Sequence, residues 1–262
     1  MSNIHTTAVI EDGAKIGNNV TIGPFVTISA MSTIGDDTVI DAHANIAGKT
    51  TIGKGNHIFS HAVVGSIPQD LKFNGEDVEL IIGDNNQIRE FTLINPGTEG
   101  GGSVTKIGNN NLLMGYVHLG HDVIMGDNCI LANGATLAGH VILGNNVVIG
   151  GLTPIHQFVH IGDFAMIAGA SALSQDIPPF CLAEGNRATL RGLNLTGLRR
   201  QLERDEINAL KTAYRELFES GEALQENAEN ILKTTASQNV KKLVEFITKS
   251  KRGIPYIRKN NG

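Results

Sequence analysis

The fold follows from residues 9–64, which read VIEDGAKIGNNVTIGPFVTISAMSTIGDDTVIDAHANIAGKTTIGKGNHIFSHAVV. This stretch repeats an aliphatic residue at every sixth position without a slip, at Ile10, Ile16, Ile22, Ile28, Ile34, Ile40, Ile46, Ile52, Ile58 and Val64. A period of six does not fit an α-helix or an alternating hairpin strand, but it fits a short flat strand followed by a tight corner. Three such units make one triangular coil of about 18 residues, and coils stack about 4.8 Å apart. The stretch therefore predicts a parallel β-helix of hexapeptide repeats.

The pattern continues beyond this stretch with one change of phase. It reappears at Ile82, Ile88 and Ile94, and then resumes one residue out of step at Ile107, Leu113, Leu119, Met125, Leu131, Leu137, Leu143, Ile149, Ile155, Ile161, Ile167 and Leu173. After Leu173 the repeat stops at Ile177-Pro178-Pro179, and apolar residues three and four apart predict helices over 207–218, 222–233 and beyond 237. We predict a β-helix over residues 1–186 and a C-terminal α-helical domain over residues 187–262, which caps the open end.

Two insertions interrupt the solenoid, over residues 66–81 and 95–106. Insertions into a repeat array form loops, and loops carry function. The first contains Gln69, Asp70 and Lys72, whereas the second contains Pro96 and a run of three glycines from Gly100. For the second loop, a plain solvent loop or a contact between subunits of a trimer is as good an interpretation as a functional one.

Charge is divided unevenly along the chain, whose formal net charge is -5. Up to residue 186 there are 6 Lys and Arg against 17 Asp and Glu, and from Arg187 onward 15 against 9. A basic tail on an acidic body predicts an anionic ligand or partner near the C-terminal half. Nucleic acid is a poor candidate, because basic and aromatic residues do not alternate and the isoelectric point is near 6.

Other compositional features restrict the class of protein. No segment approaches the roughly 18 apolar residues of a membrane span, so we expect a cytoplasmic protein. The two cysteines, Cys129 and Cys181, are too few for a disulfide framework and do not form a metal-binding pair. We expect both to be small buried residues.

The register of the repeat predicts which histidines share a face. The hexads that begin at residues 119, 137 and 155 lie one coil apart and contain His121, His140 and His156. We expect these three to form a column within reach of one ligand, with His118 near the adjoining corner. Zinc is an alternative, but three ligands must converge within about 2.1 Å of one metal. Because these histidines occupy different positions of their hexads, we predict no metal site.

Acyl transfer suits this set of residues. It needs a general base and backbone N–H groups that stabilise an oxyanion. His121 followed by Asp122 offers a base with an orienting carboxylate, and Gly139, one coil above His121, offers an amide. No Gly-x-Ser-x-Gly nucleophile motif occurs. The register alone does not choose one base among the three histidines.

The sequence resembles one family nearly from end to end, the UDP-N-acetylglucosamine acyltransferases of lipid A biosynthesis. The matching segments are Pro68-Gln69-Asp70-Leu71-Lys72-Phe73, Asn111-Leu112-Leu113-Met114, His118-Leu119-Gly120-His121-Asp122, Leu137-Ala138-Gly139-His140, Ile155-His156-Gln157-Phe158 and Gly185-Asn186-Arg187-Ala188. The resemblance implies a left-handed β-helix, a handedness that the period of six does not define.

The resemblance also implies a reaction. A 3-hydroxyacyl group would pass from acyl carrier protein to the 3-hydroxyl of UDP-N-acetylglucosamine, in the first step of lipid A biosynthesis. The attack would be direct, with His121 as base, the Gly139 backbone as oxyanion donor and no cofactor. A homotrimer is implied, because Asp70 and Lys72 match residues that contact sugar and donor across a subunit boundary.

Further positions match substrate contacts of the family. Substrate-binding roles are implied for Gln69, His118, His140, His156 and Gln157, and contacts with the nucleotide and phosphates for Asn194 and Arg200. Gly169 falls where side-chain bulk limits the acyl tunnel, so we predict an acyl chain of about fourteen carbons.

The sequence departs from many relatives near the sugar and nucleotide, where it has Asn95-Pro96, Arg187 and Thr196. A 3-amino sugar, acylated to an amide, therefore stays open as an alternative acceptor. Two alternative functions are an acetyltransferase that uses acetyl-CoA and a scaffold without catalysis. The histidines and the loop at 69–72 speak against the scaffold, and the helical tail against the acetyltransferase.

Overall fold

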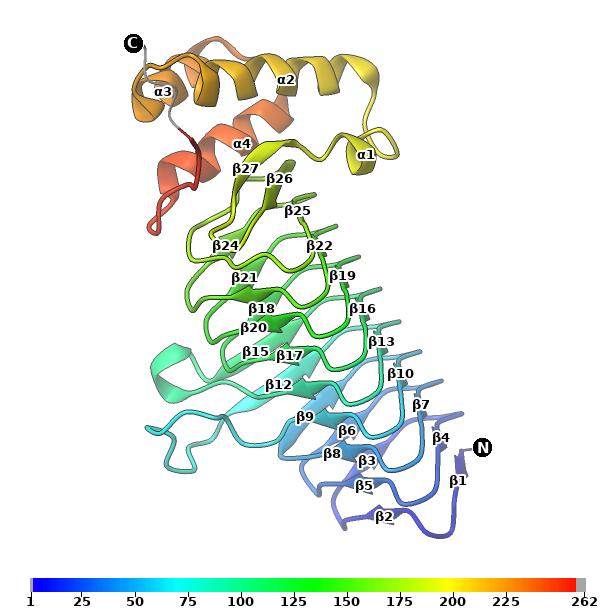
Figure 1. The fold of residues 1–262 in the computed structure, drawn as a ribbon. Coiled ribbons are helices and arrows are strands. Elements are labelled where there is room, and N and C mark those ends of the chain that lie inside the picture. The colour runs from blue at the N-terminus through cyan, green and yellow to red at the C-terminus, as the bar shows by residue number, and fades with distance from the viewer. Residues whose placement is uncertain (1, 258–262) are drawn as a thin grey trace.

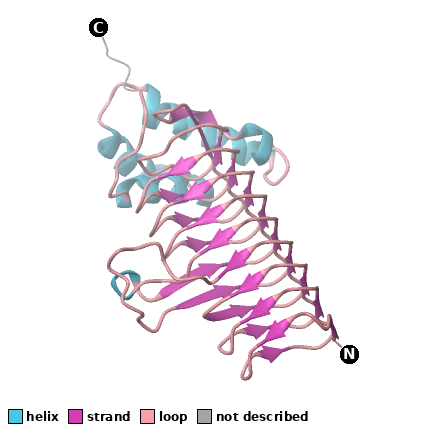
Figure 2. Cartoon of the chain, turned by 60° about the horizontal axis from the view of Figure 1, so that its bottom comes forward, coloured by secondary structure: helices cyan, strands magenta, loops and turns pink. Residues whose placement is uncertain are grey.

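Short strands and tight corners alternate along most of the chain, and the computed structural model describes residues 2–257 (Figure 1). Within these residues the strands form three flat sheets, each one side of a triangular prism (Figures 1 and 2). Sheet A contains β1 (Asn3–Ile4), β4 (Thr21–Ile22), β7 (Val39–Ile40), β10 (His57–Ile58), β13 (Gln87–Ile88), β16 (Leu112–Leu113), β19 (Ile130–Leu131), β22 (Val148–Ile149), β25 (Met166–Ile167), β26 (Cys181–Glu184) and β27 (Thr189–Leu193).

The other two sheets have eight strands each in the described part of the chain. Sheet B contains β2 (Val9–Ile10), β5 (Thr27–Ile28), β8 (Asn45–Ile46), β11 (Val63–Val64), β14 (Leu93–Ile94), β17 (His118–Leu119), β20 (Thr136–Leu137) and β23 (Pro154–Ile155). Sheet C contains β3 (Lys15–Ile16), β6 (Thr33–Ile34), β9 (Lys49–Ile52), β12 (Glu79–Ile82), β15 (Val104–Ile107), β18 (Ile124–Met125), β21 (Ile142–Leu143) and β24 (His160–Ile161).

The pairing register confirms the repeat. Each strand pairs in parallel with its equivalent on the next coil, so that Ile28 lies beside Ile46 and Leu119 beside Leu137. These aliphatic side chains point inward, and those of the central coils are fully buried. Because every coil contributes one such residue per sheet, the core is a continuous apolar column along the prism. Cys129 and Cys181 belong to this buried core, as predicted.

Both insertions leave the prism at the same corner, where sheet B passes to sheet C, and on successive coils. The first joins β11 to β12, and the second joins β14 to β15 through the short 3-10 helix η1 (Glu99–Gly101). Figure 2 shows them side by side. Each loop ends three residues before its predicted boundary, since β12 and β15 are four residues long and bury Leu80 and Thr105 as well. A period of six marks only one inward residue per strand.

Helices cover the C-terminal end of the prism: α1 (Leu195–Leu198), α2 (Arg204–Glu219), α3 (Leu224–Thr234) and α4 (Gln238–Lys249). The last three match the predicted helices. They begin later than the predicted domain boundary at residue 187, because β26 turns back into the antiparallel β27 before α1. Two adjacent strands of this kind carry no six-residue signal. No helix in residues 2–257 is long and apolar enough to cross a membrane.

Candidate active site

The corner that follows sheet B gathers polar and aromatic side chains on the coils above the two insertions. Asp122, His140 and Phe158 occupy the same corner position of successive coils, and each has a left-handed backbone with φ between 59° and 65°. The rings of His140 and Phe158 stack, with centroids 4.4 Å apart. This position puts each side chain on the outside of the prism, directly over the one below.

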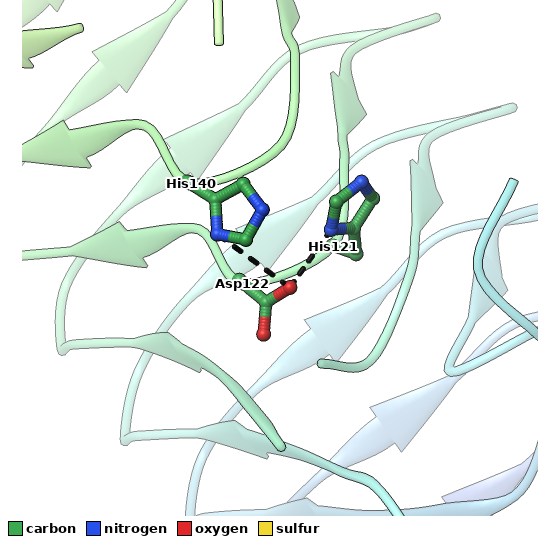
Figure 3. Close-up of side chains that lie close together, drawn as sticks. All are labelled: His121, Asp122 and His140. Atoms are coloured by element: carbon green, nitrogen blue, oxygen red, sulfur yellow. Dashed lines mark hydrogen bonds and ion pairs between the residues drawn. The ribbon is translucent and has the colours of Figure 1, made fainter. Parts of the chain in front are cut away.

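The partly buried His121 forms a pair with the buried Asp122 (Figure 3). His121 Nδ1 donates a hydrogen bond of 2.8 Å to Asp122 Oδ2, because a carboxylate only accepts. The His121 ring lies against the backbone of Gly139, where a Cβ atom would overlap with it. Glycine therefore lets the ring approach the amide of the next coil. Within residues 2–257 the Gly139 N–H has no protein acceptor.

A second histidine faces the same carboxylate. His140 Nδ1 lies 3.7 Å from Asp122 Oδ2, and its ring meets that of His121 edge to face at a centroid distance of 4.9 Å (Figure 3). Burial lowers the pKa of His140, while the nearby carboxylate partly offsets this effect. The lowered pKa favours the neutral form of the His140 ring.

Thr98, on the second insertion, completes the shell around Asp122. Its N–H donates to Oδ1 at 2.9 Å, and its hydroxyl donates to Oδ2 at 2.6 Å. Sequence analysis missed this residue. The repeat register could have indicated that this loop lies near Asp122, because the insertion after Ile94 lies one coil below the corner after Leu119. The second loop is therefore part of the site rather than a plain solvent loop.

A cavity of about 740 Å³ opens beside this pair. Both insertions and the corner contribute to its wall, which includes Asp70, Lys72, Thr98, Asp122, His140 and Phe158. Asp70 and Lys72 therefore border a substrate-sized hollow of their own chain, while the predicted contact across a subunit boundary stays a prediction. Gln69 is exposed on the same loop and is not part of the wall.

The predicted column of three histidines is wrong in its third member. His156 is exposed, and its Nδ1 donates to the Gln157 carbonyl instead of meeting His121 or His140. It stands two positions earlier in its hexad than His140, and at a corner this offset changes the direction of the side chain. Gln157 is exposed beside it, in the column of Gly139. Phe158 takes the place predicted for His156.

His118 precedes the pair on strand β17. Its Nδ1 donates to the Leu93 carbonyl at 3.1 Å. Burial lowers the pKa of His118, and the hydrogen bond to Leu93 opposes this shift. The ring is half-buried, which is consistent with a neutral residue at the edge of the site.

Asn194 and Arg200 flank α1 beyond the last strand, and Gly169 lies at another corner of the prism. The Asn194 side chain caps α1 through Gly197 N–H and donates to the Phe164 carbonyl, so it is buried and fully engaged. Arg200 is exposed just after α1. Gly169 is exposed at the corner between sheets A and B, and a Cβ atom there would meet only ordinary contacts. Within one chain none of the three joins the cavity.

The same cluster contains groups that could serve as metal ligands. The ligand atoms of His121, Asp122 and His140 lie within 4.8 Å of one another. Both Asp122 oxygens already accept short hydrogen bonds from Thr98 or His121, so a metal would have to displace them. The geometry fits a hydrogen-bonded base better than a metal shell.

A prism of hexapeptide coils with a His–Asp pair at one corner defines a hexapeptide-repeat transferase. Residues 105–139 match the bacterial transferase hexapeptide family, and residues 176–255 match domain 2 of UDP-N-acetylglucosamine O-acyltransferase. The chain belongs to the acyl-acyl-carrier-protein–UDP-N-acetylglucosamine O-acyltransferase family.

Sequence relatives cover the whole chain. It is 73% identical to the enzyme of that name from Sulfurovum sp. and 67% identical to that from Aliarcobacter butzleri, over 99% of this chain and all of each relative. The solved UDP-N-acetylglucosamine acyltransferase from Campylobacter jejuni is 52% identical, with a TM-score of 0.95 over 98% of this chain and 100% of that one. These findings confirm the predicted family, enzyme class and left-handed fold.

Proposed function

We propose that this enzyme transfers a 3-hydroxyacyl group from acyl carrier protein to the 3-hydroxyl of UDP-N-acetylglucosamine, with His121 as general base. This would be the first step of lipid A biosynthesis, and we expect it to take place in the cytoplasm. The observation that carries the assignment is the hydrogen bond from His121 Nδ1 to Asp122, because it leaves Nε2 as a free acceptor beside Gly139.

The reaction requires one base and no covalent intermediate. His121 Nε2 takes the proton of the sugar hydroxyl while that oxygen attacks the thioester carbonyl carbon. The Gly139 N–H stabilises the resulting oxyanion. The intermediate then collapses, the carbon–sulfur bond breaks, and His121 returns the proton to the departing thiolate of the carrier. Asp122 stabilises the cationic imidazole during the reaction.

Substrate contacts extend from the base along the cavity. Asp70, Lys72 and His140 lie on its wall, and we assign to them contacts with the sugar and the acyl donor. His118 lies outside the wall, on strand β17, and we expect it to contact the substrate from the edge of the site. We assign contacts with the outer parts of the bound substrates to Gln69, His156 and Gln157, which are exposed on the surface.

A homotrimer would bring the remaining residues to the site. Asn194 and Arg200 flank α1 at the C-terminal end of the chain, outside this cavity, and we expect them to approach the cavity of a neighbouring copy. A second hollow of about 440 Å³ at the start of α2 is lined by Arg199, Arg204 and Lys211 and suits an anionic partner, such as the acyl carrier protein or the diphosphate.

The direct test is an acyl-transfer assay with 3-hydroxyacyl carrier proteins of several chain lengths. Each donor is offered the 3-hydroxy and the 3-amino form of the UDP sugar. Ester formation on the 3-hydroxy sugar supports the proposal, whereas turnover of the 3-amino sugar alone would replace it with amide formation. Since Gly169 adds no bulk, we expect a donor of about fourteen carbons to outpace one of about ten. Equal or faster turnover of the shorter donor would overturn this expectation.

The role of His121 is tested in the same assay. We expect His121→Ala to lower kcat by at least about 100-fold, the lower range for loss of a general base. His5→Ala, on the exposed first coil, is the matched control and should leave kcat unchanged. Activity of His121→Ala within a few-fold of the parent would remove this residue from the mechanism.

A further inference from the structure

The Asp122 carboxylate is held by a residue that lies outside the solenoid. We propose that Thr98, on the second insertion, is a positioning residue that fixes this carboxylate so that it orients the base. The inference rests on the proposed function of His121. It assigns to the loop over residues 95–103, which also borders the cavity, a task in the chemical step through Asp122.

Hydrogen bonds from both sides hold the Asp122 carboxylate in one orientation. Thr98 donates to both oxygens, from its N–H at 2.9 Å and from its hydroxyl at 2.6 Å. Asp122 Oδ2 accepts at the same time from His121 Nδ1. The carboxylate is almost fully buried, so its hydrogen bonds must come from protein groups. The two Thr98 donors therefore fix the orientation in which Asp122 Oδ2 accepts the hydrogen bond from the His121 ring.

A competing partner makes this restraint necessary. His140 Nδ1 is only 3.7 Å from the same Oδ2 atom, on the adjacent coil. A carboxylate free to rotate could turn from His121 toward His140 and release the base from its orientation. The short Thr98 hydroxyl contact holds Oδ2 on the side of His121.

Thr98 is itself held firmly. Its carbonyl accepts hydrogen bonds from Gly101 N–H at 2.9 Å and Ser103 N–H at 2.8 Å, which close the loop into η1. The backbone of Gly101 packs so closely on the Asp122 carboxylate that a Cβ atom would overlap with it. The loop therefore contacts the carboxylate at two points, one polar and one steric.

The experiment compares three variants in the acyl-transfer assay. Thr98→Val keeps the shape and the N–H but removes the hydroxyl donor, and we expect kcat to fall about 10- to 100-fold. The KM values of both substrates should stay within about threefold, because Thr98 acts on the base and not on binding. Thr98→Ser, which retains the hydroxyl, should restore kcat to within about threefold of the parent.

Thr105→Val is the matched control. Thr105 is a buried threonine on the strand that follows the same loop, and its hydroxyl has no hydrogen-bond partner. We expect its kcat to stay within about twofold of the parent. The inference is overturned if Thr98→Val keeps parental kcat, if only KM changes, or if Thr98→Ser is as impaired as Thr98→Val.

A double-mutant cycle with Asp122→Asn separates this inference from the proposed base. If Thr98 acts through Asp122, then Thr98→Val should add less than about a twofold loss in the Asp122→Asn background. Independent, multiplying losses would contradict the inference while leaving His121 as base. Full activity of His121→Ala would instead remove His121 as the proposed base, on which this inference rests.

Discussion

Three hydrogen bonds decide what His121 can do. A histidine acts as a base only through the ring nitrogen that carries no proton, and the Asp122 carboxylate assigns the proton to Nδ1. Thr98 in turn orients that carboxylate from the opposite side. The reactivity of one imidazole therefore depends on a residue of a different coil.

At the same scale, His118 makes the stability of the fold depend on pH. Its pKa is lower in the folded chain than in the unfolded chain, so protonation favours unfolding. The contribution of neutral His118 to the free energy of unfolding is complete above the pKa of the unfolded chain, about 6.5. It is lost as pH falls through the lower pKa of the folded chain. We therefore expect stability to fall less in His118→Gln than in the parent between about pH 7.5 and about pH 5.

The measurement is urea unfolding at both pH values, followed by circular dichroism because the chain contains no tryptophan. His5→Gln is the control, since His5 is exposed on the first coil. Equal losses of unfolding free energy in the parent and in His118→Gln would show that His118 does not cause the pH dependence.

Individual residues were predictable from the sequence to different degrees. His121, Asp122 and Gly139 lie together because the eighteen-residue register defines which residues stack. The prediction for His156, the third histidine of the column, was wrong, since register does not give the direction of a corner side chain. Thr98 was missed because a single threonine in a loop belongs to no periodic sequence pattern. Its role as a hydroxyl donor is recognised only once the loop is folded against Asp122.

Among the elements, the two insertions have the most influence on the site. Both leave the prism at one corner on successive coils, and the next coil carries His121 and Asp122 at that corner. The other two corners continue without interruption, so the strands that hold the base are undisturbed. A rigid ladder thus supports loops that shape the cavity.

Gly101 tests how closely the second insertion must pack. A methyl group at this position would collide with the Asp122 carboxylate, so we expect Gly101→Ala to lower kcat at least about tenfold. The melting temperature should change little, because the loop adds few residues to the core. Gly100→Ala, whose methyl group would project into open space, should stay within about threefold of the parent. Equal activities of the two variants would show that the loop accommodates the methyl group.

The boundaries of the elements show where periodicity stops being informative. The helices α2, α3 and α4 follow from their apolar spacing, and the parallel strands follow from the period of six. The antiparallel strand β27 and the short helix α1 have neither signal, because each is defined by packing on the end of the prism. They lie between the predicted domain boundary at residue 187 and the first long helix, α2.

The whole molecule behaves as a stack in which each coil contacts its neighbours. Removal of one complete coil, Thr21–Thr38, would place Val39 in the position of Thr21, its partner in the ladder. The coil lies on the N-terminal side of both insertions. We therefore expect the shortened chain to fold with parental circular dichroism and to keep kcat within about threefold of the parent.

The matched control removes half a coil, Thr21–Ser29, which moves every later strand out of register with the first coil. We expect this chain to unfold at a markedly lower temperature or to aggregate. If both deletions were equally tolerated, register would not be the main determinant of the fold. If both were equally damaging, the coils would not be interchangeable.

The second insertion changes the phase of the sequence repeat, because Ile82 pairs with Ile107 across a gap that is not a multiple of six. In space, however, the ladder continues unbroken. The sheets therefore tolerate an insertion at this corner whose length is not a multiple of six, provided that the loop still packs Thr98 and Gly101 on Asp122. Loops at this corner can thus reshape the cavity while His121 and Asp122 keep their place on the coil above.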